Sequence, residues 1–193
     1  RPAASSILRS TDKLDQLYLN TQPMNPFLAK SFHIPWSELT PERVVPDMTI
    51  ALERAEAQMD AIRILPPEEV SFKSVPLRFC QALEDLSEAW NVVSHLDQVR
   101  NSEELREAYN EMLPMVTSFG AKVLLDQELW KQVKSFSLSE EAQGLEGPEK
   151  RLLEELVADF TEAGADLPED KRARLEKLSS ELALATQKFS ENV

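Results

Sequence analysis

The sequence contains few of the residues that hold small domains together or build reactive sites. Among 193 residues there are one cysteine, two histidines and four glycines. The single cysteine, Cys80, excludes an intrachain disulfide framework, and its simplest role is that of a small buried hydrophobic side chain. No apolar run approaches the roughly 20 residues of a membrane-spanning helix, so we expect a soluble chain with no membrane partner.

Basic residues are also few in comparison with acidic residues. Lys and Arg number 21 against 34 Asp and Glu, which gives a formal net charge of −13. This acidic excess opposes non-specific binding to nucleic acid and to anionic membranes. We therefore expect no nucleic-acid partner, and any charged partner should be cationic.

The common catalytic and metal-binding motifs are missing. The chain has no H-E-x-x-H pair, no Gly-rich phosphate loop, no C-x-x-C and no nucleophile elbow. His33 and His95 are far apart in the chain, so a zinc site would need ligands from distant segments. Ser94 is adjacent to His95 and cannot face it on a helix. The residues alone predict no catalytic and no metal-binding residue, and substrate-binding residues stay unknown.

Charged residues form several clusters that invite a functional interpretation. Paired carboxylates can act as acid and base, but acids also favour helix starts and solvated faces, and we prefer that interpretation. The basic residues alternate with acids, which is typical of salt pairing on an exposed helix. The acidic pairs are Glu68 and Glu69, Glu103 and Glu104, Glu140 and Glu141, and Glu154 and Glu155; the basic residues are Lys171, Arg172, Arg174 and Lys177.

The N-terminal part is predicted to be irregular. Residues 1–22 should form a flexible tail, in which 11–19 can make a short amphipathic helix and 1–10 faintly resemble the end of an organellar transit peptide. Prolines then alternate with apolar and aromatic residues over 22–39. This composition predicts an extended strap across a helical surface, with its aromatic side chains buried.

Helical periodicity follows. Thr40 and Pro41 signal a helix start, and apolar spacing continues to about Ile64. The stretch 72–115 predicts two helices joined by a polar corner, at which Asn101 and Glu104 fit a capping box. We expect the second helix to bend at its interior proline and to continue to about residue 133.

The last third predicts three more helical segments. Residues 139–143 fit one turn, Pro148 opens a longer helix, and Gly164 is its expected left-handed stop. A final helix starts at Leu167 and Pro168, and its apolar stripe is Leu175, Leu178, Leu182 and Phe189. No segment alternates in the manner of a strand. The predicted fold is all-α: an antiparallel bundle of about five long helices with an N-terminal proline-rich strap, forming one domain over 23–193.

Several short blocks carry a family resemblance. In order they are Asn25-Pro26-Phe27-Leu28, Thr40 to Pro46, Val93-Ser94-His95-Leu96, Asn101 to Tyr109, Leu113-Pro114, Asp159-Phe160, Gly164 to Pro168 and Phe189 to Val193. With these blocks the chain resembles the N-terminal region of the thimet oligopeptidase and oligopeptidase A family of zinc metallopeptidases. Two departures concern local loop geometry: Arg43 stands where such proteins often have His, and residues 131–147 are not recognisable.

The resemblance implies an enzyme longer than this chain, with a helical body and a deep channel that admits short peptides. The zinc-binding H-E-x-x-H helix of such enzymes would lie beyond Val193, so the chain should be truncated from a larger peptidase and inactive alone. It would hold no cofactor itself, while zinc serves the parent enzyme. Its partners would be the missing catalytic domain and short peptides, and its location the cytoplasm or, alternatively, an organelle matrix.

A second hypothesis stays open beside this one. The chain could be a free-standing helical module that binds peptides or proteins without catalysis. Its excess of acidic residues favours a cationic partner.

Overall fold

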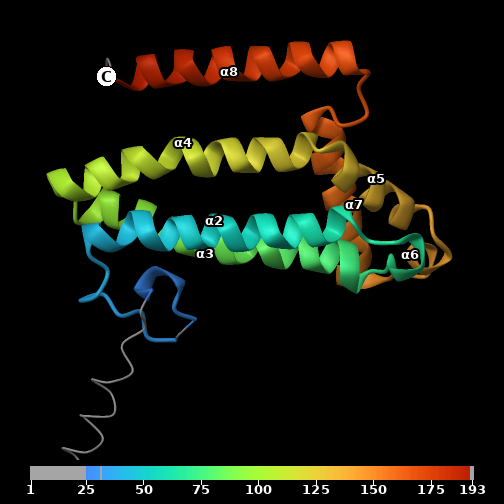
Figure 1. The fold of residues 1–193 in the computed structure, drawn as a ribbon, viewed down its shortest axis with the longest axis horizontal. Helices are drawn as coiled ribbons and strands as arrows, with labels where there is room; N and C mark the ends of the chain where they lie inside the picture. The colour runs from blue at the N-terminus through green and yellow to red at the C-terminus, as the bar shows by residue number, and fades with distance from the viewer. Residues whose placement is uncertain (1–24, 31, 192–193) are drawn as a thin grey trace, which may run out of the picture. The chain divides into compact units, whose positions relative to one another are not determined.

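The computed structural model describes residues 25–30 and 32–191. Within these ranges every regular element is helical and no strand occurs (Figure 1), which confirms the all-α prediction. The predicted tail over 1–22, with its short helix at 11–19, lies outside the described residues. None of the described helices is long and apolar enough to cross a membrane.

The chain divides into two compact units by its internal contacts. Unit 1 consists of residues 1–51 and 87–112, and unit 2 of residues 52–86 and 113–193. Helices α2, α3 and α4 are each divided between the two units, with one part in unit 1 and the other in unit 2. The prediction that residues 23–193 form one domain stays a prediction.

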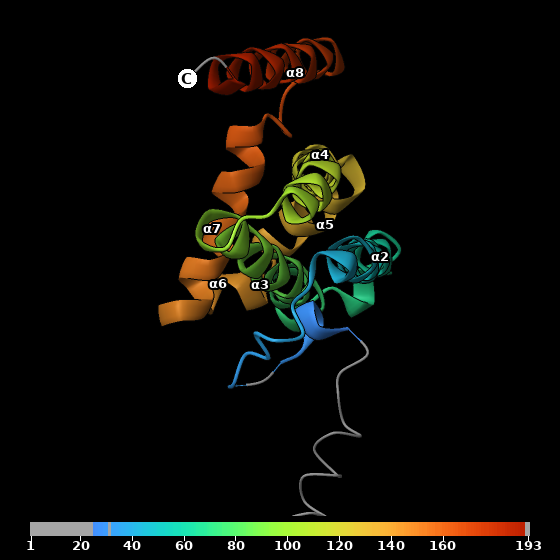
Figure 2. The ribbon, with the colours of Figure 1, turned by 90° about the vertical axis from the view of Figure 1, so that its left-hand side faces the viewer.

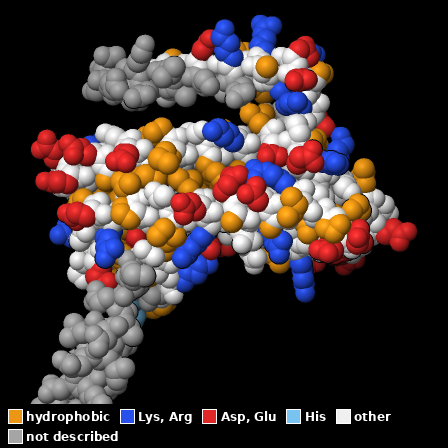
Figure 3. Space-filling model, in the orientation of Figure 1, with side chains coloured by type: hydrophobic (Ala, Val, Ile, Leu, Met, Phe, Trp, Pro, Cys, Tyr) orange, Lys and Arg blue, Asp and Glu red, His pale blue; other side chains and the backbone are white. Residues whose placement is uncertain are grey.

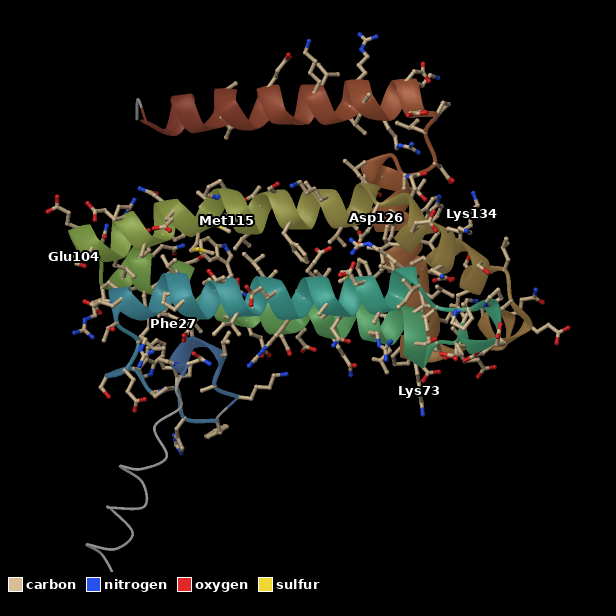
Figure 4. The ribbon with its side chains drawn as sticks, in the orientation of Figure 1. Phe27, Lys73, Glu104, Met115, Asp126 and Lys134 are labelled. Carbon is tan, nitrogen blue, oxygen red and sulfur yellow. The ribbon has the colours of Figure 1, made fainter. Side chains whose placement is uncertain are left out.

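Unit 1 begins with the strap and the first half of α2. Helix α2, Pro41–Arg63, starts at the predicted proline. The backbone amide of Phe27 donates to the buried Asp47 Oδ2 at 3.0 Å, and Figure 4 shows Phe27 below the start of α2. This bond holds the short 3-10 helix η1, Pro26–Leu28, against α2.

The rest of the strap corrects the prediction that its aromatic residues are buried. Phe27 and Leu39 are buried, but Phe32 is 97% exposed and Trp36 is 46% exposed. The strap is fixed by Phe27 at one end and by Leu39, next to the α2 start, at the other. Pro35 has no amide to donate, so the segment between these anchors cannot form a regular ladder of hydrogen bonds.

The polar corner of unit 1 is present, with a different cap from the one expected. Helices α3, Arg78–Val99, and α4, Glu103–Leu125, are joined by residues 100–102 (Figure 2). The Ser102 hydroxyl accepts the amide of Leu105 at 3.2 Å. Because α4 begins at Glu103, Ser102 occupies the capping position, and the predicted Asn101 stands one residue too early.

Unit 2 has a large apolar core. It is built from α5, Gln127–Ser137, α7, Gly147–Ala163, and the parts of α2, α3 and α4 that belong to this unit. The buried members of its main cluster are Met59, Ile62, Val75, Phe79, Ala82, Val123, Leu129, Trp130, Val133, Leu156, Phe160 and Ala165. A smaller cluster joins Phe72, Phe136 and Leu153.

The helix predicted to run to about residue 133 is in fact two helices. Helix α4 ends at Leu125, and Asp126 has an extended backbone with φ −69° and ψ 119°. The Asp126 side chain accepts the amides of Glu128 and Leu129 and so caps α5. An aspartate in this role competes with continuation of the preceding helix, which accounts for the break.

The entry to α3 is irregular. The 3-10 helix η2, Pro67–Glu69, and the π-helix η3, Lys73–Leu77, precede it. Pro76 lies inside η3, and the amide of Leu77 donates to the Phe72 carbonyl at 3.0 Å. Since proline has no amide, the regular α-helical ladder cannot pass through this position, and the regular helix begins at Arg78.

The last elements follow the predictions closely. Ser139 caps the single turn α6, Glu140–Gln143, and α7 ends at Gly164, whose φ of 93° is left-handed. A Cβ at Gly164 would lie 2.6 Å from Leu175 Cδ2, so this position needs glycine for space as well as for conformation. Helix α8, Glu169–Glu191, completes the described chain.

Candidate functional site

The two histidines lie in unit 1 and are both exposed. The His33 ring meets the Phe32 ring edge-on at 5.2 Å within the strap. The His95 ring, near the end of α3, lies 6.3 Å from the Trp36 ring. Over the described residues no group of three or more His, Cys, Asp or Glu side chains is placed to hold a metal ion.

The acidic pairs are all exposed, and those with described contacts take part in structure. The Glu141 carboxylate accepts the amide of Phe72 at 3.1 Å, and Glu155 pairs with Arg151 at 2.7 Å. On Glu104 the pKa is lowered by its own backbone amide and by the Ser102 hydroxyl. Figure 3 shows one group of acidic side chains over the start of α4, where acids complement the helix dipole.

Cys80 is half-buried against the main core of unit 2. Burial raises the pKa of its thiol, and the nearby carboxylates Asp159, Glu84 and Glu155 raise it further. A thiol that is harder to deprotonate is a weaker nucleophile. Cys80 therefore packs against the core, although it is half-buried rather than buried as predicted, and it is a poor candidate for chemistry.

Two basic residues of α8 make local contacts. Arg172 Nη1 donates to the Leu167 carbonyl at 3.3 Å, and Lys177 lies 3.9 Å from Glu181 one turn ahead. Such contacts are those expected of an exposed helix.

The most extensive polar network of unit 2 centres on Arg63 at the end of α2. Its guanidinium bonds Asp126 at 2.8 Å, Glu56 at 2.7 Å and Asp60 at 2.6 Å. Partial burial lowers the pKa of Arg63, but the three carboxylates outweigh this effect and raise the pKa above its ordinary value. Gln132 adds bonds to the carbonyls of Arg63 and Leu65. The network fixes the α2 end against the α4–α5 junction, which Figure 4 marks with Asp126.

A second network ties α5 to the loop after α7. Trp130 Nε1 and Lys134 Nζ both donate to Asp166 Oδ1, at 3.0 and 2.8 Å. The Lys134 bond and then the Trp130 bond lower the pKa of Asp166. The Trp130 ring stacks on Phe160 at 5.6 Å, and Lys134 lies 5.3 Å from the Trp130 centroid. Trp130 therefore links the Asp166 carboxylate, through its ring nitrogen, to the aromatic side chains of the core.

The α3–α4 corner of unit 1 has its own polar and aromatic contacts. Arg106 Nε lies 2.8 Å from the Oδ1 of the buried Asp97. That oxygen receives no hydrogen bond from the described residues, so the contact is an ion pair only. The Trp90 and Tyr109 rings stack at 5.0 Å with a 14° interplanar angle, which places the two helices side by side within the unit.

The α3–α4 corner and the loop after α7 overlap two of the blocks that carry the resemblance, Asn101 to Tyr109 and Gly164 to Pro168. Residues 44–172 match the protein family described as Neurolysin/Thimet oligopeptidase, N-terminal domain. The chain belongs to this family. The match spans parts of both units.

Curated relatives of this oligopeptidase family agree. Oligopeptidase A of Salmonella typhimurium is 27% identical over 169 residues, which are 88% of this chain and 25% of that protein. Probable cytosolic oligopeptidase A of Arabidopsis thaliana is 26% identical over 174 residues, 90% of this chain and 24% of that protein. The organellar, chloroplastic/mitochondrial oligopeptidase A of the same plant is 24% identical over 173 residues, which are 90% of this chain and 22% of that protein. The chain spans about a quarter of the length of these relatives.

Sequence reasoning missed the residues that anchor both networks. Arg63 and Asp166 carry no local signal, because their partners lie far away in the chain. Asp126 could have been found, since an aspartate followed by Gln-Glu-Leu is a helix-start signal. Several of the family-like blocks serve as helix caps, stops and corners, and in the described part of the chain the geometry assembles no catalytic constellation from them.

Proposed function

We propose that this chain is the non-catalytic N-terminal helical part of a zinc-dependent oligopeptidase that cleaves short peptides, and that it helps to wall the substrate channel. The observation that carries the proposal is the family match over residues 44–172, in a chain that spans about a quarter of its oligopeptidase A relatives. Its partners are then the catalytic part of the same polypeptide and short peptides as substrates.

The proposal places the zinc site outside this chain, in the catalytic part of the polypeptide. The donors present here do not fit the ion, because the described residues contain no suitable group of three ligands. Both histidines contact aromatic rings of the strap rather than each other. Zinc would be held by the catalytic part, and no residue of this chain is assigned to it.

The reading frame that encodes this segment gives the first test. We expect it to continue beyond Val193 and to encode an H-E-x-x-H helix. The isolated 193-residue chain, given zinc, should show no chelator-sensitive cleavage of short peptides. A frame without the motif, or measurable turnover by the isolated chain, would overturn the proposal.

The role in the channel wall needs a separate test. Met115 on α4 is 48% exposed and Leu113 is 38% exposed, which makes both accessible to oxidative footprinting. In the full-length enzyme, a bound peptide that resists cleavage should reduce labelling at exposed side chains of α2, α3 or α4. If labelling of all three helices stays unchanged while the peptide is bound, these helices do not line the channel.

A free-standing binding module is the second candidate, and the net charge of −13 favours it for a cationic partner. It predicts a stop codon just after Val193 and micromolar binding of basic peptides that weakens with salt. Calorimetry with Lys-rich and Glu-rich peptides of equal length tests it. Equal or absent binding of the two would remove this candidate.

Location is proposed as cytoplasmic, with an organelle matrix as the alternative. The names of the two plant relatives describe a cytosolic and an organellar protein. Fluorescence microscopy of the tagged full-length protein distinguishes the two compartments.

A further inference from the structure

Helix α8 carries an apolar stripe that the described residues leave open. Leu178 is 51% exposed and Leu182 is 69% exposed, whereas Leu175, at the start of the stripe, is partly buried near Gly164. Two leucines one turn apart with this exposure lack the stabilisation that burial gives to an apolar side chain.

The spacing of the stripe indicates what kind of surface would cover it. Leu175, Leu178 and Leu182 of the predicted stripe, together with Ala185, follow one another at alternating steps of three and four residues. This is the narrow a/d seam by which one helix packs along another. Flanking positions are charged, with Arg174 and Lys177 on one turn and Glu181 on the next. A seam bordered by charges fits a single amphipathic helix better than a broad apolar sheet.

We propose that the α8 stripe docks against an amphipathic helix contributed by the remaining part of the same polypeptide. The inference rests on the proposed function. A second copy of the chain could also present a helix, but the curated relatives are about four times as long as the matched segment. In a protein of that length, a covering helix is tethered to α8 and has a high effective concentration, so the intramolecular partner prevails over a second copy.

The test compares two leucines of similar exposure in the full-length protein. Leu182→Glu alters the stripe, and Leu138→Glu, at a position 73% exposed at the end of α5, is the matched control. Docking should protect α8 from trypsin at the exposed Lys177. Leu182→Glu should speed cleavage there by about tenfold or more, because local opening sets the rate, while Leu138→Glu leaves it unchanged. Equal rates in the two variants would overturn the inference.

Two further measurements separate the alternatives. Leu182→Ala keeps helix propensity and removes most of the contact, so an intermediate rate should appear even if the glutamate variant folds poorly. Sedimentation of the 193-residue chain should show a monomer; a dimer abolished by Leu182→Glu would assign the stripe to a second copy and overturn the intramolecular partner. Peptidase activity of the unmodified full-length protein is assayed in parallel. Its absence would count against the proposed function, while the trypsin comparison still decides the docking.

Discussion

The two units stabilise similar helices by different means. In the described part of unit 1, Phe27 is a buried ring, whereas Trp36, Trp90 and Tyr109 are exposed or half-buried, and two carboxylates, Asp47 and Asp97, are buried. Unit 2 shows the reverse pattern. Five of its rings are buried and Phe119 is half-buried, and all the buried side chains described there are apolar; the buried rings are Phe72, Phe79, Trp130, Phe136 and Phe160.

The contrast separates two ways of fixing helices. Unit 2 gains from apolar burial, and its polar networks around Arg63 and Asp166 join helix ends and loops at the margins of the core. Unit 1 places carboxylates in its interior, where each charge costs free energy unless a donor compensates it. We therefore expect unit 2 to respond most to changes of volume, and unit 1 to changes of charge and pH.

The largest effect should come from the centre of unit 2. Phe160 is fully buried and contacts the rings of Phe79 and Trp130. Phe160→Ala should lower the free energy of unfolding by about 3–5 kcal/mol in urea denaturation, because it leaves a cavity. Phe32→Ala, at a 97% exposed ring of unit 1, should change it by less than about 0.5 kcal/mol. Equal losses would refute the contrast between the units.

A smaller loss is expected at the α4–α5 junction. Asp126→Ala removes both the cap of α5 and one carboxylate of the Arg63 network, and should cost about 2–3 kcal/mol. Arg63 keeps Glu56 and Asp60, so it is not left unpaired. Asp126→Asn retains a capping oxygen and should recover about half of the loss in the same denaturation assay. If the alanine variant is as stable as the wild type, the junction is held by packing alone.

The glycines of unit 2 offer a matched pair. Gly164→Ala should cost about 1–2 kcal/mol, since the position is left-handed, and its methyl group would meet Leu175 and Leu167. Gly120 lies inside α4 with nothing within 4 Å of an added Cβ. Gly120→Ala should raise stability by about 0.5–1 kcal/mol. Shifts of the thermal midpoint in opposite directions confirm the pair; shifts of the same sign contradict it.

The smallest effect should reveal the charge sensitivity of unit 1. Burial raises the pKa of Asp47 above its ordinary 3.8, while the Phe27 amide and Arg43 lower it in part. Because the folded pKa is raised, the stability contributed by this group is complete below pH 3.8 and is lost as the pH rises through the folded pKa. Asp47→Asn keeps an acceptor for Phe27 and should alter stability by under about 1 kcal/mol at pH 7.

The measurement for Asp47 is a difference between two pH profiles. The free energy of unfolding of the wild type, relative to Asp47→Asn, should increase as the pH falls towards 3.8. Phe32→Ala, at an exposed side chain that does not titrate, is the control and should leave a flat difference. A flat difference for Asp47→Asn as well would show that its burial has no electrostatic cost.

What the sequence predicts depends on the range of the interaction. The start of α2, the turn at α6 and the stop at Gly164 follow from signals within a few residues, and all are found. The cap at Ser102 was missed by one position, because Asn and Ser are both good caps and periodicity does not locate a helix start to a single residue. The exposure of Phe32 could not be foreseen, since it depends on where the strap is anchored. The pairing of Arg63 with Asp126 is non-local, and no spacing rule reports it.

The environment of Cys80 has a practical consequence. Its half-buried thiol, with a pKa raised by burial and by three carboxylates, is mostly protonated at neutral pH and hard to reach. A cysteine introduced at an exposed position such as Leu138 or Phe32 would react with a maleimide much faster. Spin labels or fluorophores can therefore be attached at chosen pairs of sites without removing the native cysteine. Distances between two such labels, one in each unit, would measure how the units are arranged in solution.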